Sequence, residues 1–126
     1  MVITAFNMYN YIGKKRITMD YIIILCTINS IENAETIANN LLQDHFAACI
    51  NIIPQIQSYY FWNGKIQNDE EFLLLIKTGK NLFNSVKERI EKLHPYEIPE
   101  IISIDITTGN QKYLTWIKDN TINFMQ

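Results

Sequence analysis

The sequence contains little glycine and cysteine, and each shortage excludes a class of site. Only four glycines occur among 126 residues, and Gly79-Lys80 lacks the upstream glycine and the following serine or threonine of a phosphate-binding loop. The two cysteines, Cys26 and Cys49, form no Cys-x-x-Cys motif, so no zinc or thiol-exchange site is indicated. Reduced cysteines in apolar segments are typical of the cytoplasm, where we expect this protein.

The chain also lacks a surplus of one charge and a long apolar segment. Eleven basic and thirteen acidic residues give a net charge of −2, which offers no drive toward phosphate backbones or anionic lipids. The longest apolar runs, residues 21–28 and 72–76, are far shorter than the roughly 20 residues of a membrane-spanning helix. We therefore expect neither nucleic acid nor membrane as a partner.

The length predicts a single domain. With 126 residues, 48% of them hydrophobic, the chain can bury one core but not two typical ones. The first convincing strand begins after Met19. We therefore expect residues 1–18 to be a disordered N-terminal extension and residues 19–126 to form the domain.

Hydrophobic spacing predicts an α+β protein. Strands are expected at residues 21–28, 48–62, 65–78 and 100–107, and helices near residues 31–42, 82–93 and 110–120. Asn29 or Ser30 is suited to cap the first helix, Asn63-Gly64 to turn a hairpin, and Pro95 to end the second helix. The order β-α-β-β-α-β plus a terminal helix is that of a ferredoxin-like sandwich.

The predicted hairpin is long and apolar on both faces. Tyr59, Tyr60, Phe61 and Trp62 alternate between its two sides, and one domain has only one core to cover them. Pro54 predicts a bulge or an edge position in the first arm. We expect partner chains to bury the second face; the alternative is a monomer in which the last helix folds back over the rings.

Residues 94–100 hold the densest group of functional side chains. Pro95 and Pro99 stiffen this loop, which presents His94, Tyr96 and two glutamates, Glu97 and Glu100. One interpretation is a preorganised binding site. The other is a rigid connector whose glutamates are merely solvated.

His94 and Cys26 are the candidate metal ligands. Imidazole and thiolate suit copper or zinc, but a complete site needs further donors, from a carboxylate or another subunit. Alternatively, Cys26 is a small buried hydrophobe. Lys77, at the end of an apolar strand, is either a pocket cation or a surface lysine.

The sequence contains no nucleophile–base pair and no Gly-rich loop. We therefore predict neither an enzyme nor an organic cofactor.

Several separate segments resemble, in the same order, the motifs of CutA proteins. They are AACINIIP (47–54), SYYFWNGK (58–65), IKT (76–78) and HPYEIPEI (94–101), with Cys26-Thr27 before them and YLTW (113–116) after them. The resemblance covers residues 21–117. It implies a homotrimer in which the hairpins wrap neighbouring subunits, and a link to divalent-metal tolerance.

The resemblance also implies where ligands bind. In some members of the family, copper binding is assigned to a first-strand cysteine and a His-His pair. These correspond here to Cys26, Leu93 and His94, so the first histidine is replaced. Besides His94, the implied intersubunit cleft contains Trp62, Lys77, Tyr96, Glu97 and Glu100.

Three functions follow as hypotheses. The first is a trimeric divalent-cation tolerance protein that binds copper or a similar metal and takes part in the response to metal ions. The second is a small-ligand sensor resembling the trimeric PII signalling proteins, which the missing glycine-rich loops disfavour. The third is a scaffold that trimerises attached partners.

Overall fold

The computed structural model describes residues 20–122. The predicted extension, residues 1–18, lies outside the described residues. Within the described part, no helix has the length and apolar character needed to cross a membrane. The α+β class and the predicted order of strands and helices are confirmed. The elements are β1 (Tyr21–Ile28), α1 (Ile31–Gln43), β2 (Cys49–Trp62), β3 (Lys65–Gly79), a 3-10 turn (Lys80–Leu82), α2 (Phe83–Leu93), β4 (Ile102–Ile106) and α3 (Gln111–Asp119).

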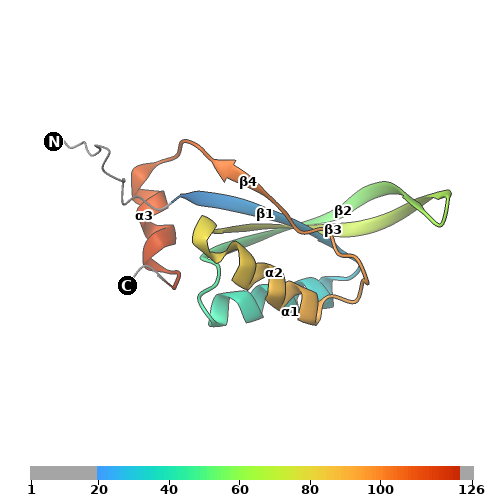
Figure 1. Cartoon of the computed structure of the whole chain (residues 1–126), viewed down its shortest axis with the longest axis horizontal. Coiled ribbons are helices and arrows are strands. Elements are labelled where there is room, and N and C mark those ends of the chain that lie inside the picture. Colours follow the sequence, from blue (N-terminus) through green and yellow to red (C-terminus); the bar gives the residue numbers. More distant parts are fainter. Residues whose placement is uncertain (1–19, 123–126) are drawn as a thin grey trace.

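The four strands form one antiparallel sheet in the order β2-β3-β1-β4. Helices α1 and α2 cover one face of it (Figure 1). Alternate residues of β1, such as Ile22 and Ile24, point to these helices and are fully buried, as are Ile37 and Ile90 on the helices. Ser30 caps α1, because its side chain accepts a hydrogen bond from the backbone N–H of Asn33 at 3.1 Å.

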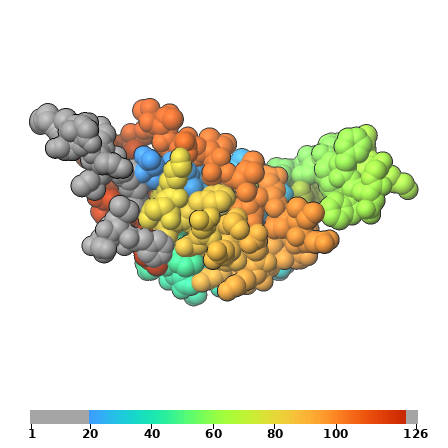
Figure 2. Space-filling model, viewed as in Figure 1, coloured from blue at the N-terminus to red at the C-terminus, as the bar shows by residue number. Residues whose placement is uncertain are grey.

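Strands β2 and β3 form a hairpin that extends beyond the helices (Figure 1) and stands out as a separate lobe (Figure 2). Its turn has the predicted left-handed residues, Asn63 at φ 52° and Gly64 at φ 75°. A bulge shifts the register between Ile53 and Ile56, so Pro54 and Gln55 lie opposite one residue of β3. Since β2 is also an edge strand, both of the predicted positions for a proline are realised.

Among residues 20–122, no helix covers the other face of the sheet over β1 and β4. Ile102 and Ile104 of β4 lie beside Leu25 and Ile23 of β1, and their side chains are 53% and 54% exposed. In the single chain this side of β4 is open, because both long helices pack on the opposite face. We call this surface the open face.

The aromatic rings of the hairpin are exposed as well. Phe61 is 74% exposed, and Tyr59 and Ile66 are nearly as open. Helix α3 lies at the other end of the sheet (Figure 1). It therefore does not fold back over the rings, as the monomeric alternative requires.

Candidate functional site

A cleft of about 820 Å³ lies between the hairpin and the loop that joins α2 to β4. Trp62, Tyr96, Glu97 and Glu100, four of the predicted cleft residues, contribute to its walls within one chain. The remaining lining residues are Thr27, Asn29, Ser58, Tyr59, Tyr60, Asp69, Glu70, Glu71, Ile98 and Pro99. The volume is in the range of small-molecule sites.

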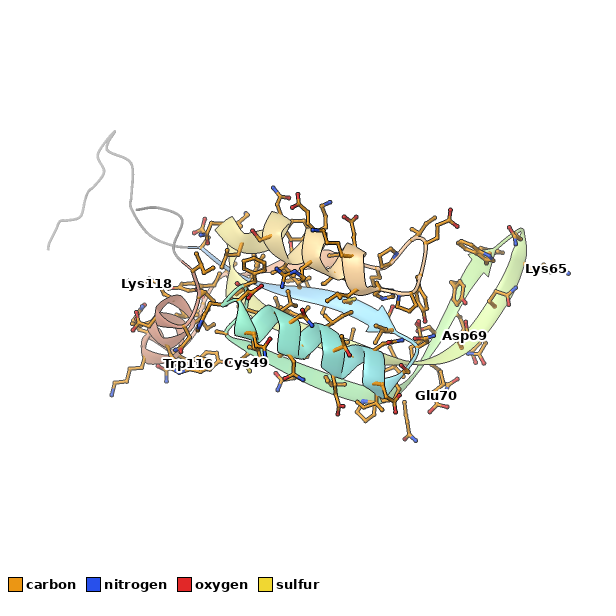
Figure 3. The ribbon with its side chains drawn as sticks, turned by 90° about the horizontal axis from the view of Figure 1, so that it is seen from below. Cys49, Lys65, Asp69, Glu70, Trp116 and Lys118 are labelled. Carbon is orange, nitrogen blue, oxygen red and sulfur yellow. The ribbon has the colours of Figure 1, made fainter. Side chains whose placement is uncertain are left out.

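All charged side chains that line the cleft are acidic. Five carboxylates contribute to it, three from β3 and two from the loop, and no lysine, arginine or histidine is among the lining residues. Two of them, Asp69 and Glu70, are labelled on the hairpin in Figure 3. Walls of one charge concentrate the field in a cleft, so this cleft attracts cations and repels anions.

Glu71 is the most buried of these carboxylates, at 5% exposure. One of its oxygens accepts a hydrogen bond from the Tyr96 hydroxyl at 2.6 Å, which ties the hairpin to the loop. The other oxygen accepts no hydrogen bond from any described residue, and Glu71 forms no ion pair within residues 20–122. Burying a carboxylate with one hydrogen bond and no ion pair costs free energy, and a cationic partner would offset this cost.

The phenols at the cleft act as hydrogen-bond donors. Burial and the bond to Glu71 raise the pKa of Tyr96 well above its usual value, so its hydroxyl stays protonated. The Tyr60 hydroxyl donates to Asp69, and this bond raises the pKa of Tyr60. Burial, followed by the charge of Glu71, also raises the pKa of Glu100.

His94 holds the loop against β1 with both of its ring nitrogens. Nδ1 accepts from the Tyr96 backbone N–H at 3.1 Å, so the proton lies on Nε2, which donates to the Thr27 carbonyl at 2.8 Å. The side chain is 8% exposed, and burial lowers the pKa of His94. The neutral ring thus has no free nitrogen, and binding a metal requires one of these bonds to break.

Cys26 lies on the helix-covered side of β1 and is fully buried. Burial, followed by the charges of Glu100 and Glu71, raises the pKa of its thiol to about 12. The thiol is therefore protonated at neutral pH. No group of three or more histidine, cysteine or acidic side chains close enough to hold a metal ion occurs among residues 20–122.

We expect native Cys26 to resist alkylation. At about pH 8, iodoacetamide should leave Cys26 unmodified while the native protein remains folded, because only an exposed thiolate reacts. Peptide mass spectrometry measures the modification, and the same protein unfolded in guanidinium, where both cysteines should react, is the control. Rapid modification of Cys26 in the folded protein would contradict its burial.

The structure places Lys77 outside this cleft. Its ammonium lies 4.0 Å from the Cys49 sulfur and is hydrogen-bonded to Asn51. Cys49 lies at the α3 end of the molecule, near Trp116 and far from the labelled hairpin carboxylates (Figure 3). The placement of Lys77 in an intersubunit cleft stays a prediction.

Three important residues were not predicted from the sequence as part of the cleft: Asp69, Glu71 and Tyr60, which was named only as an aromatic ring of the hairpin. The signal for the acidic ones was the run Asp69-Glu70-Glu71 directly before the apolar half of β3. Since alternate strand residues share a face, Asp69 and Glu71 lie on the same side. The pairing of β2 with β3 adds Tyr60 and Trp62 to that side.

Comparison with known proteins identifies the family of this chain. Residues 22–120 match the family model described as CutA1 divalent ion tolerance protein. A divalent-cation tolerance protein CutA from Thermus thermophilus is 46% identical over 99 residues, which are 79% of this chain and 96% of the relative. The chloroplastic protein CutA of Arabidopsis thaliana is 42% identical over 106 residues; these cover 84% of this chain but only 58% of the plant protein.

Solved structures agree with this assignment. The divalent cation tolerance protein of Thermus thermophilus superposes with a TM-score of 0.79 at 44% identity, over 80% of this chain and 98% of the other. For CutA1 from Oryza sativa the TM-score is 0.81 at 39% identity, over 83% and 96% of the two chains.

Proposed function

Because this chain belongs to the CutA1 divalent ion tolerance family, we propose that it is a cytoplasmic homotrimer that binds divalent cations and takes part in the response to metal ions. The observation that supports cation binding is the cleft lined by five carboxylates and no basic side chain. Its relatives are named as tolerance proteins, and we propose no reaction.

The open face supports the trimer. Ile102 and Ile104 are more than half exposed, and they continue the apolar surface of Ile23 and Leu25. The exposed side of the hairpin, with Phe61, adds a second uncovered apolar area. Contiguous apolar surfaces of this kind are characteristic of subunit interfaces.

Carboxylate oxygens are the preferred ligands of hard cations such as Mn²⁺ and Mg²⁺. Such ions retain several waters, so one or two carboxylates of the cleft are sufficient to hold a hydrated ion. Copper at Cys26 and His94, which the resemblance implies, is the second candidate. It requires the loss of a thiol proton with a pKa of about 12 and the release of one bond of His94.

The two other hypotheses receive less support. A PII-like sensor of an anionic nucleotide would have to place phosphates beside the carboxylates of the cleft, which repel them. A pure trimerising scaffold leaves the burial of Glu71 without a cationic partner unexplained.

Calorimetric titration of the full chain with Mn²⁺ and with Cu²⁺ tests the proposal. We expect saturable Mn²⁺ binding that weakens roughly tenfold or more in Glu71→Gln, since a charge-assisted contact is lost. Glu91→Gln, on the exposed side of α2, is the matched control and should bind as the wild type does. Copper binding that disappears in Cys26→Ser would move the site to the second candidate, and a protein that binds neither metal would refute metal binding altogether.

A further inference from the structure

The cleft is much larger than one metal ion requires. In the single chain its volume of about 820 Å³ lies between two walls, with Asp69 and Glu71 on the hairpin and Glu97 and Glu100 on the loop. No three acidic, cysteine or histidine side chains in residues 20–122 converge closely enough to surround a single ion. The negative charges are therefore distributed along the cleft and suit a ligand whose positive charges are also separated.

Aromatic rings accompany these charges. Because the register pairs Trp62 with Lys65, Tyr60 with Gln67 and Ser58 with Asp69, Tyr60 and Trp62 lie on the same side of the hairpin as Asp69 and Glu71. Tyr96 lines the cleft from the loop, bonded to Glu71. Aromatic faces attract ammonium groups and also pack against the methylene chain that carries them.

Glu71 supplies a specific anchor. It is only 5% exposed, and one carboxylate oxygen has no donor among the described residues. An ammonium group donates three hydrogen bonds, so it can supply the missing donor to this oxygen directly.

We propose that the cleft binds an aliphatic polyamine. One ammonium group pairs with Glu71, a second pairs with Glu97 or Glu100 on the loop, and the methylene chain between them packs against Tyr60, Trp62 and Tyr96. This ligand is an organic counterpart of a divalent cation, and it uses the aromatic wall, which a metal ion does not need. Its binding requires no metal ion, although both kinds of cation would use Glu71.

The test is a titration of the full-length protein with spermidine, followed by calorimetry. We expect saturable binding that is roughly tenfold weaker in Glu71→Gln and about as much weaker in Trp62→Ala. Two matched controls should bind like the wild type: Trp116→Ala, whose tryptophan on α3 is 44% exposed against 45% for Trp62, and Glu91→Gln on α2. The neutral diol 1,4-butanediol, which carries two hydroxyls on a four-carbon chain and no ammonium group, should not bind.

Either of two results would overturn the proposal. One is an absence of saturable spermidine binding, and the other is equal weakening in Glu71→Gln and Glu91→Gln, which would indicate unspecific attraction to a negative protein. A Mn²⁺ titration of the same preparations keeps the two proposals apart. A protein that binds Mn²⁺ but not spermidine retains the proposed function and loses only this inference, whereas Trp62→Ala should weaken spermidine binding and leave Mn²⁺ binding unchanged.

Discussion

Ile104→Asp is expected to convert the protein from trimers to single chains. The wild type should sediment with three times the 14.8 kDa of one chain, and the variant with 14.8 kDa. Ile104 is 54% exposed in the single chain and lies beside Ile23 on the open face. A carboxylate introduced there would have to be buried without a partner in the trimer, and this costs several kcal/mol per chain.

The assembly is measured by analytical ultracentrifugation at micromolar concentration. Leu42→Asp is the matched control, because Leu42 is also an exposed aliphatic residue but lies on α1, outside the open face. It should leave the mass unchanged. A wild type that already sediments as one chain would refute the trimer, and a trimeric Ile104→Asp variant would show that the open face is not the interface.

The second large effect is expected for His94→Ala. This substitution removes a buried ring that accepts a hydrogen bond from the Tyr96 backbone N–H and donates one to the Thr27 carbonyl. Leaving the buried Thr27 carbonyl and the partly buried Tyr96 N–H unpaired costs about 1 to 3 kcal/mol each, so we expect a loss of about 2 to 4 kcal/mol in the free energy of unfolding. Denaturant titration measures it. A loss below about 0.5 kcal/mol would show that these bonds do not hold the loop.

The same residue should make the stability depend on pH. Burial lowers the pKa of His94 below its ordinary value of 6.5, against the weaker opposing effects of the Thr27 bond and Glu71. Between the folded pKa and 6.5, the unfolded chain binds a proton that the folded chain does not, so stability falls as the pH falls. From about pH 8 to about pH 5.5, the wild type should therefore lose stability that His94→Ala does not lose.

The elements were predictable because local chemistry determines them. The β-branched run of β1, the Ser30 cap and the Asn63-Gly64 turn depend on residues close in the sequence, and all three appear as predicted. Pro54 indicated the bulge for the same reason, since a missing N–H affects the ladder wherever the strand lies.

The cleft was predictable only in part. The loop from His94 to Glu100 stood out by composition, and the family resemblance added Trp62. The importance of Glu71 depends on Tyr96, which lies 25 residues away in the sequence and becomes a neighbour only after folding. Likewise, an imidazole in a sequence looks available to a metal, and only the fold shows that both nitrogens of His94 already have partners.

The bulge at Pro54 and Gln55 determines which side of the hairpin each later side chain of β2 faces. Before the bulge, odd-numbered residues such as Ile53 share a side with Leu73; after it, even-numbered residues such as Tyr60 take over that side. If the same residues paired with β3 without the bulge, every later side chain of β2 would face the opposite side. Tyr59 would then lie opposite Gln67 and Phe61 opposite Lys65, in the places of Tyr60 and Trp62, so one backbone irregularity decides which half of an aromatic strand faces the carboxylates.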